Sequence, residues 1–411
     1  MKGYTYLIIG GGIAGGKACQ GIRDVDGSGT AALITKEDHP PYQRPPLSKG
    51  FLKNEVDLDR VYLQSPEKYE EWDVELIQGK EVIDLSPQDH IVTLDDGQEI
   101  GYEKLLLATG GSAIRLPIWG AELENVFTLR SIEDAKKIRE AASTNARALV
   151  MGGSFIGAEV SATISQLGAQ VVEIFPESRL LEHVVPEELS QYLHERYEEH
   201  HVRLLPGTVS EGLEGETSVQ RAIISNGEKI DVDFVVMGVG IKLNTDFAKG
   251  SGLDIRQDGT IPVNEHLQTA HPDIFAAGDI TSWPDPNSDR RLHVEHWDVA
   301  RRQGRTAGRN MAGNQEKYAA LPYFFSDLYD LSFEVWGELT NWDQTVQRGS
   351  LKKGSFSFFY FDQGRLIGVL AVNRPEEERT AMEKLPEMQP TYDEIADQLQ
   401  DQDYNMQELI S

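Results

Sequence analysis

The chain has 411 residues and a formal net charge of −28 at pH 7, with 67 acidic and 39 basic side chains. Its length exceeds what one hydrophobic core usually serves, so we expect two or three domains. The acidity argues against binding to nucleic acid or to anionic membranes, because both would repel the chain. No apolar run reaches the roughly 18 residues of a membrane span, and the first strand leaves no room for a leader, so we expect a soluble cytoplasmic protein.

The first predicted elements surround a glycine-rich turn. Gly10, Gly12 and Gly15 follow the spacing G-x-G-x-x-G. In such a turn the first glycine permits the bend, the second lets the backbone approach a pyrophosphate, and the third lets the helix pack on its strand. The diphosphate then lies on the amides of a helix N-terminus. The predicted order is a strand at residues 6–9, the turn, a helix at 14–23 and a strand at 31–34.

Cys19 lies in this first helix and is the only cysteine of the chain. A single cysteine excludes an intramolecular disulfide, and with it the active-site dithiol of disulfide reductases. We expect a buried packing residue at this position.

The next part of the chain reads as strands. Residues 75–94 alternate apolar and polar side chains, and Asp96-Gly97 is typical of a hairpin turn. A buried strand at 105–107 then runs into Ala108, Thr109 and Gly110, which predicts a close approach of the backbone to a ligand or to the next domain.

A second glycine-rich turn follows the strand predicted at residues 148–151. It consists of Gly152, Gly153, Ser154, Phe155, Ile156 and Gly157. One such turn also occurs for packing reasons alone, but two after strands in one chain indicate two bound dinucleotides. The common chemical reason for that arrangement is hydride transfer from a nicotinamide to a flavin. The predicted elements after it are a helix at 158–167, a strand at 171–174 and an apolar run at 234–240 that ends at Gly240.

The last third of the chain contains one more strand-to-turn segment, which ends in Gly278 and Asp279, and an arginine-rich helix predicted over 297–311. Residues 354–373 alternate like an antiparallel hairpin with a turn at Gln363-Gly364. The acidic residues beyond about 375 predict a solvated helix or a partly ordered tail.

The segment Arg44-Pro45-Pro46-Leu47-Ser48-Lys49, together with both glycine turns, resembles the FAD-dependent pyridine nucleotide oxidoreductases, in the branch of ferredoxin reductases and apoptosis-inducing factor. The resemblance covers about residues 4–375. It implies an α/β fold with two Rossmann-like domains of the glutathione reductase type and a C-terminal α+β domain. The expected domains are 1–114 with 243–318 for FAD, 115–242 for NAD, 319–385 at the C-terminus, and an acidic tail at 386–411.

The resemblance also implies the site residues, without a metal site. The residues implied at FAD are Gly10, Gly12, Ala14, Gly15, Glu37, Arg44, Lys49, Ala108, Thr109, Gly110, Asp279, His296, Trp297 and Phe325. The residues implied at NAD are Gly152, Gly153, Ser154, Phe155, Ile156, Glu177 and Gly240. Lys49 and Glu159 would form a catalytic pair beside flavin N5, since a buried lysine and glutamate are tolerable only together; the alternative is two surface charges. The helix that begins near His296 would direct its positive dipole end at the flavin.

The chain departs from the family pattern at four places. Lys36 occupies the usual position of the acid that binds the FAD ribose, so we name Glu37 instead. Ser154 replaces the second glycine of the NAD turn. Phe175 replaces the acid after the next strand, and Glu177 follows it; a carboxylate there repels a 2′-phosphate, so we expect NADH to be preferred over NADPH, although Arg179 nearby weakens this expectation. Phe325 stands where many ferredoxin reductases have a tryptophan.

The leading functional hypothesis is an FAD enzyme that takes hydride from NAD(P)H and passes single electrons to a [2Fe-2S] ferredoxin. The alternatives are a slow redox sensor that resembles apoptosis-inducing factor and forms a charge-transfer complex, and an NADH oxidase or quinone reductase. We expect a monomer or a homodimer. Ferredoxins are usually acidic, so a local basic patch would help docking. One arginine cluster could form this patch or could pair with neighbouring acids: Arg290, Arg291, Arg301, Arg302, Arg305 and Arg309.

Overall fold

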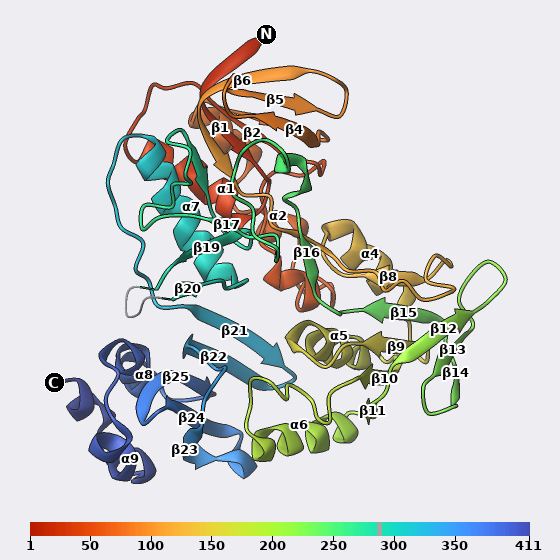
Figure 1. Cartoon of the computed structure of the whole chain (residues 1–411). Helices are drawn as coiled ribbons and strands as arrows, with labels where there is room; N and C mark the ends of the chain where they lie inside the picture. Colours follow the sequence, from red (N-terminus) through yellow and green to blue (C-terminus); the bar gives the residue numbers. More distant parts are fainter. Residues whose placement is uncertain (286–289) are drawn as a thin grey trace. The chain divides into compact units, whose positions relative to one another are not determined.

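The computed structural model describes residues 1–285 and 290–411, which form two compact units (Figure 1). The first unit contains Met1–Pro45, Val56–Ser112 and Ile241–Ala320. The second contains Pro46–Glu55, Ala113–Gly240 and Leu321–Ser411. Short elements lie where the chain passes from one unit to the other: η1 (Pro45–Ser48), β7 (Gly111–Ala113) and β16 (Ile241–Leu243).

The first unit is built on a mixed sheet of strand order β3-β2-β1-β6-β5-β4, with β18 also paired to β6. Its strands are β1 (Lys2–Ile9), β2 (Ala31–Ile34), β3 (Val74–Ile77), β4 (Val82–Ser86), β5 (Ile91–Leu94), β6 (Glu99–Leu107) and β18 (Ile274–Ala276). The apolar ends of β1 and β6 are fully or almost fully buried, as expected for parallel strands that are covered on both faces. Gly97 adopts φ +83° in the turn between the antiparallel strands β5 and β6, which confirms the predicted hairpin.

Helices and a small sheet complete the first unit. They are α1 (Ile13–Arg23), α2 (Leu58–Val61), α3 (Pro66–Glu71), η2 (Asp246–Ala248), α7 (Trp297–Met311), β17 (Ile261–Pro262), β19 (Thr281–Pro284) and β20 (Arg291–Leu292). Cys19 is buried on α1, and burial raises the pKa of its thiol to about 12. It is therefore a packing residue rather than a thiolate nucleophile.

Helices α1 and α7 pack in backbone contact. A Cβ at Gly304 would lie 2.2 Å from the carbonyl oxygen of Ala14, and a Cβ at Gly308 would lie 2.3 Å from that of Ala18. On the facing side, a Cβ at Gly21 would lie 2.2 Å from the carbonyl oxygen of Arg305. These glycines let α7 lie directly against the helix that follows the first glycine turn.

The part of the second unit that is expected to bind NAD is a parallel sheet of order β11-β10-β9-β15-β8. Its elements are β8 (Val126–Thr128), α4 (Ile132–Ala141), β9 (Arg147–Met151), α5 (Phe155–Gln166), β10 (Gln170–Phe175), α6 (Glu187–Glu199), β11 (Val202–Pro206) and β15 (Phe234–Met237). A three-stranded antiparallel sheet accompanies it: β12 (Ser210–Glu214), β13 (Arg221–Ile224) and β14 (Lys229–Asp231). Helix α5 begins three residues earlier than predicted, because the residue after Ser154 is already helical.

The C-terminal part of the second unit is a five-stranded antiparallel sheet of order β21-β22-β25-β24-β23. Its elements are β21 (Tyr323–Leu328), β22 (Leu331–Gly337), β23 (Gln344–Ser350), η3 (Leu351–Lys353), β24 (Ser355–Asp362), β25 (Arg365–Val372), α8 (Glu376–Met388), α9 (Tyr392–Gln400) and η4 (Met406–Ile410). The predicted turn at Gln363-Gly364 joins β24 to β25.

The residues predicted as an acidic tail are ordered on this sheet. Ile395, Leu399 and Met406 are buried in one core with Phe359, Phe361 and other residues of β24 and β25. The acidic side chains lie at exposed positions, so the helix expected as one alternative is present, but it is amphipathic and has a buried apolar face.

Aromatic side chains connect the C-terminal sheet to the parallel sheet within the second unit. The ring of Phe333 lies 6.3 Å from that of Phe155 at the start of α5, and the ring of Phe356 lies 5.8 Å from that of Tyr192 on α6. Within residues 1–285 and 290–411, no helix is long and apolar enough to cross a membrane, and no cluster of side chains suits a metal ion.

Candidate active site

The first glycine turn is shaped by backbone contacts that only glycine allows. Gly10 has φ +120°, and a Cβ on it would lie 2.1 Å from the carbonyl oxygen of Ala108. A Cβ at Gly15 would lie 2.0 Å from the carbonyl oxygen of Gly10, so α1 starts in contact with the turn. At Gly12, the N-cap of α1, a Cβ would meet the Arg44 guanidinium at 3.3 Å and nothing else within 4 Å among the described residues. A helix N-terminus beside an arginine suits a diphosphate.

Glu37 belongs to a network next to this turn. Its carboxylate accepts hydrogen bonds from the Tyr42 hydroxyl at 2.7 Å and from Arg44 at 3.2 Å. The Arg44 guanidinium also lies 5.2 Å from the centre of the Tyr42 ring. Lys36, which occupies the usual ribose-acid position, points away and pairs with Glu81 on the surface. The position of Glu37 therefore suits the expected contact with a ribose.

The strand ends near the turn are fixed by a side chain that the sequence analysis did not identify. Gln303 of α7 is fully buried, and its amide oxygen accepts the N–H of Gly278 at 2.8 Å and the hydroxyl of Thr281 at 2.9 Å. Gly278 has φ +82°, and Asp279 follows it. A polar residue in the middle of a helix rich in small residues was the available signal for Gln303. Just beyond the end of β6, the Thr109 hydroxyl donates to the carbonyl oxygen of Asn244 at 2.6 Å.

Helix α7 begins at Trp297, with His296 as its N-cap, as expected from the sequence. Burial lowers the pKa of His296 to about 4, so the imidazole is neutral at pH 7. The positive end of the helix dipole therefore contributes positive potential at this N-terminus, whereas His296 carries no charge. Asp298 in the first turn of the helix is buried.

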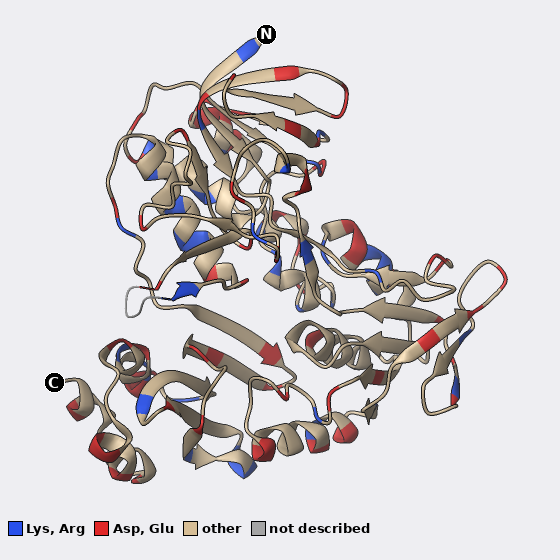
Figure 2. Ribbon diagram, viewed as in Figure 1, with Lys and Arg blue, Asp and Glu red and all other residues tan. Residues whose placement is uncertain are grey.

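Basic residues recur along helix α7 (Figure 2). Most arginines of the cluster pair with acids of the first unit. Asp298 accepts Arg301 at 2.6 Å and Arg302 at 2.5 Å. Asp24 accepts Arg305 and Arg309, both at 2.9 Å. The remaining two arginines are engaged as well: Arg290 by Asp285, and Arg291 by the carbonyl oxygens of Val263 and Ser282. These contacts favour the pairing interpretation over a dedicated docking patch.

The second glycine turn repeats the construction of the first. Gly152 has φ +123°, and a Cβ on it would lie 2.3 Å from the carbonyl oxygen of Gly238. A Cβ at Gly157 would lie 1.8 Å from the carbonyl oxygen of Gly152. Ser154 is the N-cap of α5, and Ile156 beside it is 45% exposed. The turn thus presents another helix N-terminus at the carboxyl end of a parallel strand.

Two departures from the usual NAD pattern have a structural explanation. The Phe175 ring fills the space next to Gly153, where a Cβ would lie 2.6 Å from the ring, so an aromatic replaces an acid at this position. Glu177 lies two residues beyond β10, and its Oε2 atom is buried and has no hydrogen-bond partner among the described residues. The Arg179 guanidinium is 3.5 Å from the Glu182 carboxylate, which offsets the charge of the arginine.

Gly240, the last residue expected at NAD, adopts φ +98° after β15.

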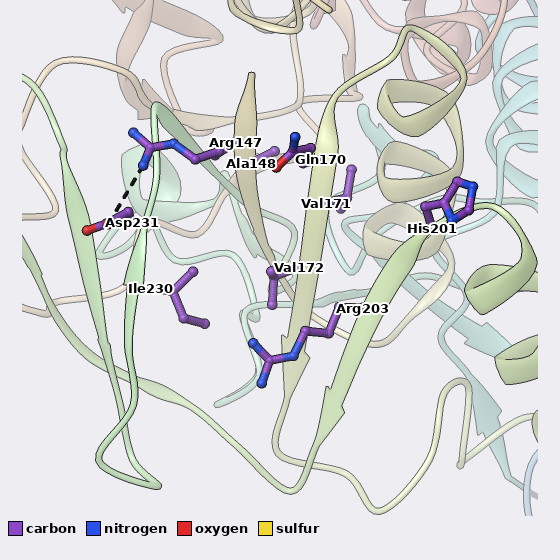
Figure 3. A pocket seen from close by; sticks show the side chains of 9 residues that line it. All are labelled: Arg147, Ala148, Gln170, Val171, Val172, His201, Arg203, Ile230 and Asp231. Atoms are coloured by element: carbon purple, nitrogen blue, oxygen red, sulfur yellow. Dashed lines mark ion pairs between the residues drawn. The ribbon is translucent and has the colours of Figure 1, made fainter. Parts of the chain in front are cut away.

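A hollow of about 370 Å³ lies at the opposite edge of the same sheet (Figure 3). It is lined by residues near the starts of β9, β10 and β11, including Arg147, Gln170 and Arg203. Arg147 pairs with Asp233, and Arg203 pairs with Glu228. Because both cations already have carboxylate partners, this hollow offers no evident anion site.

Lys49 and Glu159 form the ion pair that the resemblance implies. Their charged atoms are 2.5 Å apart, and their side chains are only 15% and 4% exposed, which rules out two independent surface charges. The Phe325 ring centre lies 5.7 Å from the Lys49 ammonium. Both residues of the pair, with Phe325, belong to the second unit, whereas the other residues expected at FAD belong to the first.

Two serines that the sequence analysis did not identify also contact Glu159. The Ser48 hydroxyl donates to Oε2 at 2.5 Å, and the Ser326 hydroxyl donates to Oε1 at 2.6 Å. The Ser48 carbonyl oxygen accepts the Thr163 hydroxyl at 2.7 Å. Their sequence positions, one residue before Lys49 and one after Phe325, were the only signal.

Known proteins match this chain over most of its length. The sequence profile of the pyridine nucleotide-disulphide oxidoreductases matches residues 4–304, and the reductase C-terminal profile matches residues 323–410. The chain is 33% identical to the ferredoxin–NAD(+) reductase component of 3-phenylpropionate/cinnamic acid dioxygenase from Photorhabdus laumondii, over 92% of this chain and 95% of that protein. It is 30% identical to monodehydroascorbate reductase 3 of Arabidopsis thaliana, over 96% and 95%.

Solved structures give the same picture for the whole chain. The covalent putidaredoxin reductase–putidaredoxin complex matches with a TM-score of 0.93 at 29% identity, over 100% of this chain and 98% of that one. The ferredoxin reductase of the CYP199A2 system from Rhodopseudomonas palustris matches with a TM-score of 0.92 at 30% identity, over 99% and 100%.

Proposed function

Because the chain belongs to the pyridine nucleotide-disulphide oxidoreductase family, we propose that it is an NADH-dependent reductase that delivers single electrons to a [2Fe-2S] ferredoxin. The chain is an NAD(P)H oxidoreductase, and its cofactors are FAD and NAD(H). Bound FAD supplies the chemistry that side chains lack, since it accepts hydride from a nicotinamide and gives up electrons one at a time. The cytoplasmic location expected from the sequence stays a prediction.

The observation that carries the proposal is the pair of glycine turns, built alike on two parallel sheets of one chain. Gly10 and Gly152 have nearly the same φ, +120° and +123°, and each turn opens a helix. Cys19 is the only cysteine and is buried, so electrons do not leave through a dithiol. The relatives indicate which protein accepts the electrons, because several of them are named as reductases of ferredoxins.

The residues of the chain then have separate tasks. Arg44 and the start of α1 bind the FAD diphosphate, and Glu37 binds the adenosine ribose. The N-terminus of α7 stabilises negative charge on the reduced cofactor. Lys49 and Glu159 act as a net-neutral pair in hydride transfer, since a buried pair can orient groups without adding charge.

Anaerobic rapid mixing of the FAD-loaded protein with NADH tests this function. We expect fast bleaching of the flavin band, followed by reduction of an added [2Fe-2S] ferredoxin such as putidaredoxin. Slow bleaching with persistent long-wavelength absorbance would support the redox-sensor alternative. Fast bleaching without ferredoxin reduction would support an oxidase or quinone reductase.

Replacing Glu159 tests the catalytic pair. E159Q leaves the Lys49 ammonium without its carboxylate in a site where the lysine is only 15% exposed. We expect the limiting rate of flavin reduction to fall at least about tenfold. E216Q, at an exposed position of the same unit, serves as the control. An unchanged limiting rate in E159Q would remove this role from the pair.

Replacing Glu177 tests the choice of nucleotide. Its buried Oε2 has no hydrogen-bond partner among the described residues, so it is available to ribose hydroxyls and would repel a 2′-phosphate. We expect E177Q to lower the ratio of kcat/KM for NADH over NADPH by about tenfold, mainly through KM. Steady-state kinetics with both nucleotides measure this ratio, and a wild-type ratio would place the ribose contact elsewhere.

A further inference from the structure

The Glu159 carboxylate is held by donors from separate parts of the chain. Lys49 and Ser326 both contact Oε1, at 2.5 and 2.6 Å, and Ser48 contacts Oε2 at 2.5 Å. Lys49 and Ser48 come from the segment Pro46–Glu55, whereas Ser326 comes from the C-terminal sheet. Thus a domain without a glycine turn of its own contacts the catalytic pair.

The place of Ser326 is fixed by its strand. Ser326 is 1% exposed and pairs with Phe333 in the register of β21 with β22. The ring of Phe324, two residues before it, lies 5.0 Å from that of Phe155 in the first turn of α5. Strand and helix are therefore packed together beside the hydrogen bond, and the Ser326 hydroxyl has a defined direction.

We propose that Ser326 is a positioning residue for hydride transfer, through which the C-terminal domain fixes the Glu159 carboxylate. The proposal rests on the function proposed above, in which the Lys49–Glu159 pair acts on the reaction. A hydroxyl donor orients a carboxylate without neutralising it, so the pair keeps its charge while its rotation is restricted. Without this donor, Oε1 retains Lys49 alone, whose long flexible side chain is a poor orienting group.

The test compares S326A with S326T, which keeps the hydroxyl, and with S357A. Ser357 is a fully buried serine of the same sheet whose hydroxyl has no hydrogen-bond partner among the described residues, so it controls for the loss of a buried oxygen. Each FAD-loaded variant is mixed anaerobically with a range of NADH concentrations. The limiting rate of flavin reduction and the apparent Kd for NADH are measured separately, and the flavin spectrum and circular dichroism check the fold.

We expect S326A to lower the limiting rate about tenfold while Kd changes less than about twofold, because Ser326 acts through Glu159. S326T should recover most of the rate, and S357A should match the wild type. Equal losses in S326A and S357A, or a wild-type rate in S326A, would overturn the inference. If E159Q is slow while S326A is not, only this inference fails; if E159Q also has the wild-type rate, the proposed role of the pair fails.

Discussion

At the scale of single residues, Glu173 is a carboxyl group in an unusual place. It lies on β10, fully buried, with both oxygens lacking a hydrogen-bond partner among the described residues. Three polar groups interact with it. Ser161 acts to lower the pKa of Glu173, and the Glu173 carboxyl acts to raise the pKa values of Tyr197 and Tyr329. Burial raises its pKa from 4.5 to about 8, so the folded protein holds a proton there at neutral pH.

The raised pKa of Glu173 predicts how the free energy of unfolding depends on pH. In the unfolded chain Glu173 ionises above about pH 4.5, whereas in the folded chain it stays neutral up to about pH 8. Its contribution therefore lowers the free energy of unfolding as pH rises from about 5 to 8, by a few kcal/mol at most. E173Q should remove this loss, so its Tm should exceed that of the wild type increasingly from pH 5 to 8, with E216Q as control. A Tm difference that does not change with pH would contradict the raised pKa.

At the scale of elements, one buried arginine connects the chain terminus to the C-terminal sheet. Arg348 on β23 is 2% exposed and donates to Glu378 on α8, to the carbonyl oxygen of Leu399 in the last turn of α9, and to those of Gln402 and Tyr404 beyond it. These carbonyls lie at or just beyond the C-terminal end of α9, where the helix itself supplies no donor. The arginine thus satisfies several backbone groups with one planar side chain.

Removing this arginine should loosen the terminus. R348M leaves the carbonyl groups and Glu378 without their buried donor, which we expect to cost about 3 kcal/mol. The segment after α8 should then become the first site of limited proteolysis, with flavin reduction little changed in the intact fraction. K384M, at an exposed position of α8, is the matched control. Equal protease resistance in R348M and the wild type would show that the apolar contacts of α9 suffice.

At the scale of the whole molecule, local patterns predicted local structure well. Both glycine turns, the strands before them and the bounds of α7 followed from the sequence, because a positive φ and a helix start depend on neighbouring residues. The Lys49–Glu159 pair came from resemblance alone, since 110 residues separate its members. Ser48, Ser326 and Gln303 could not be predicted, because a hydroxyl or amide gains its role only from the partner that the fold places beside it.

The segment Pro46–Glu55 has a consequence for how the chain can be recombined. By its contacts it belongs to the second unit, although both flanking stretches belong to the first. A Thr163 hydroxyl, the Glu159 carboxylate and Arg139 hold it there. A chimera that exchanges residues 115–242 for the equivalent part of a relative would keep this loop but replace the surface with which it makes these contacts. The nucleotide-binding domains of this protein are not interchangeable modules unless the ten-residue loop is transplanted with its acceptor surface.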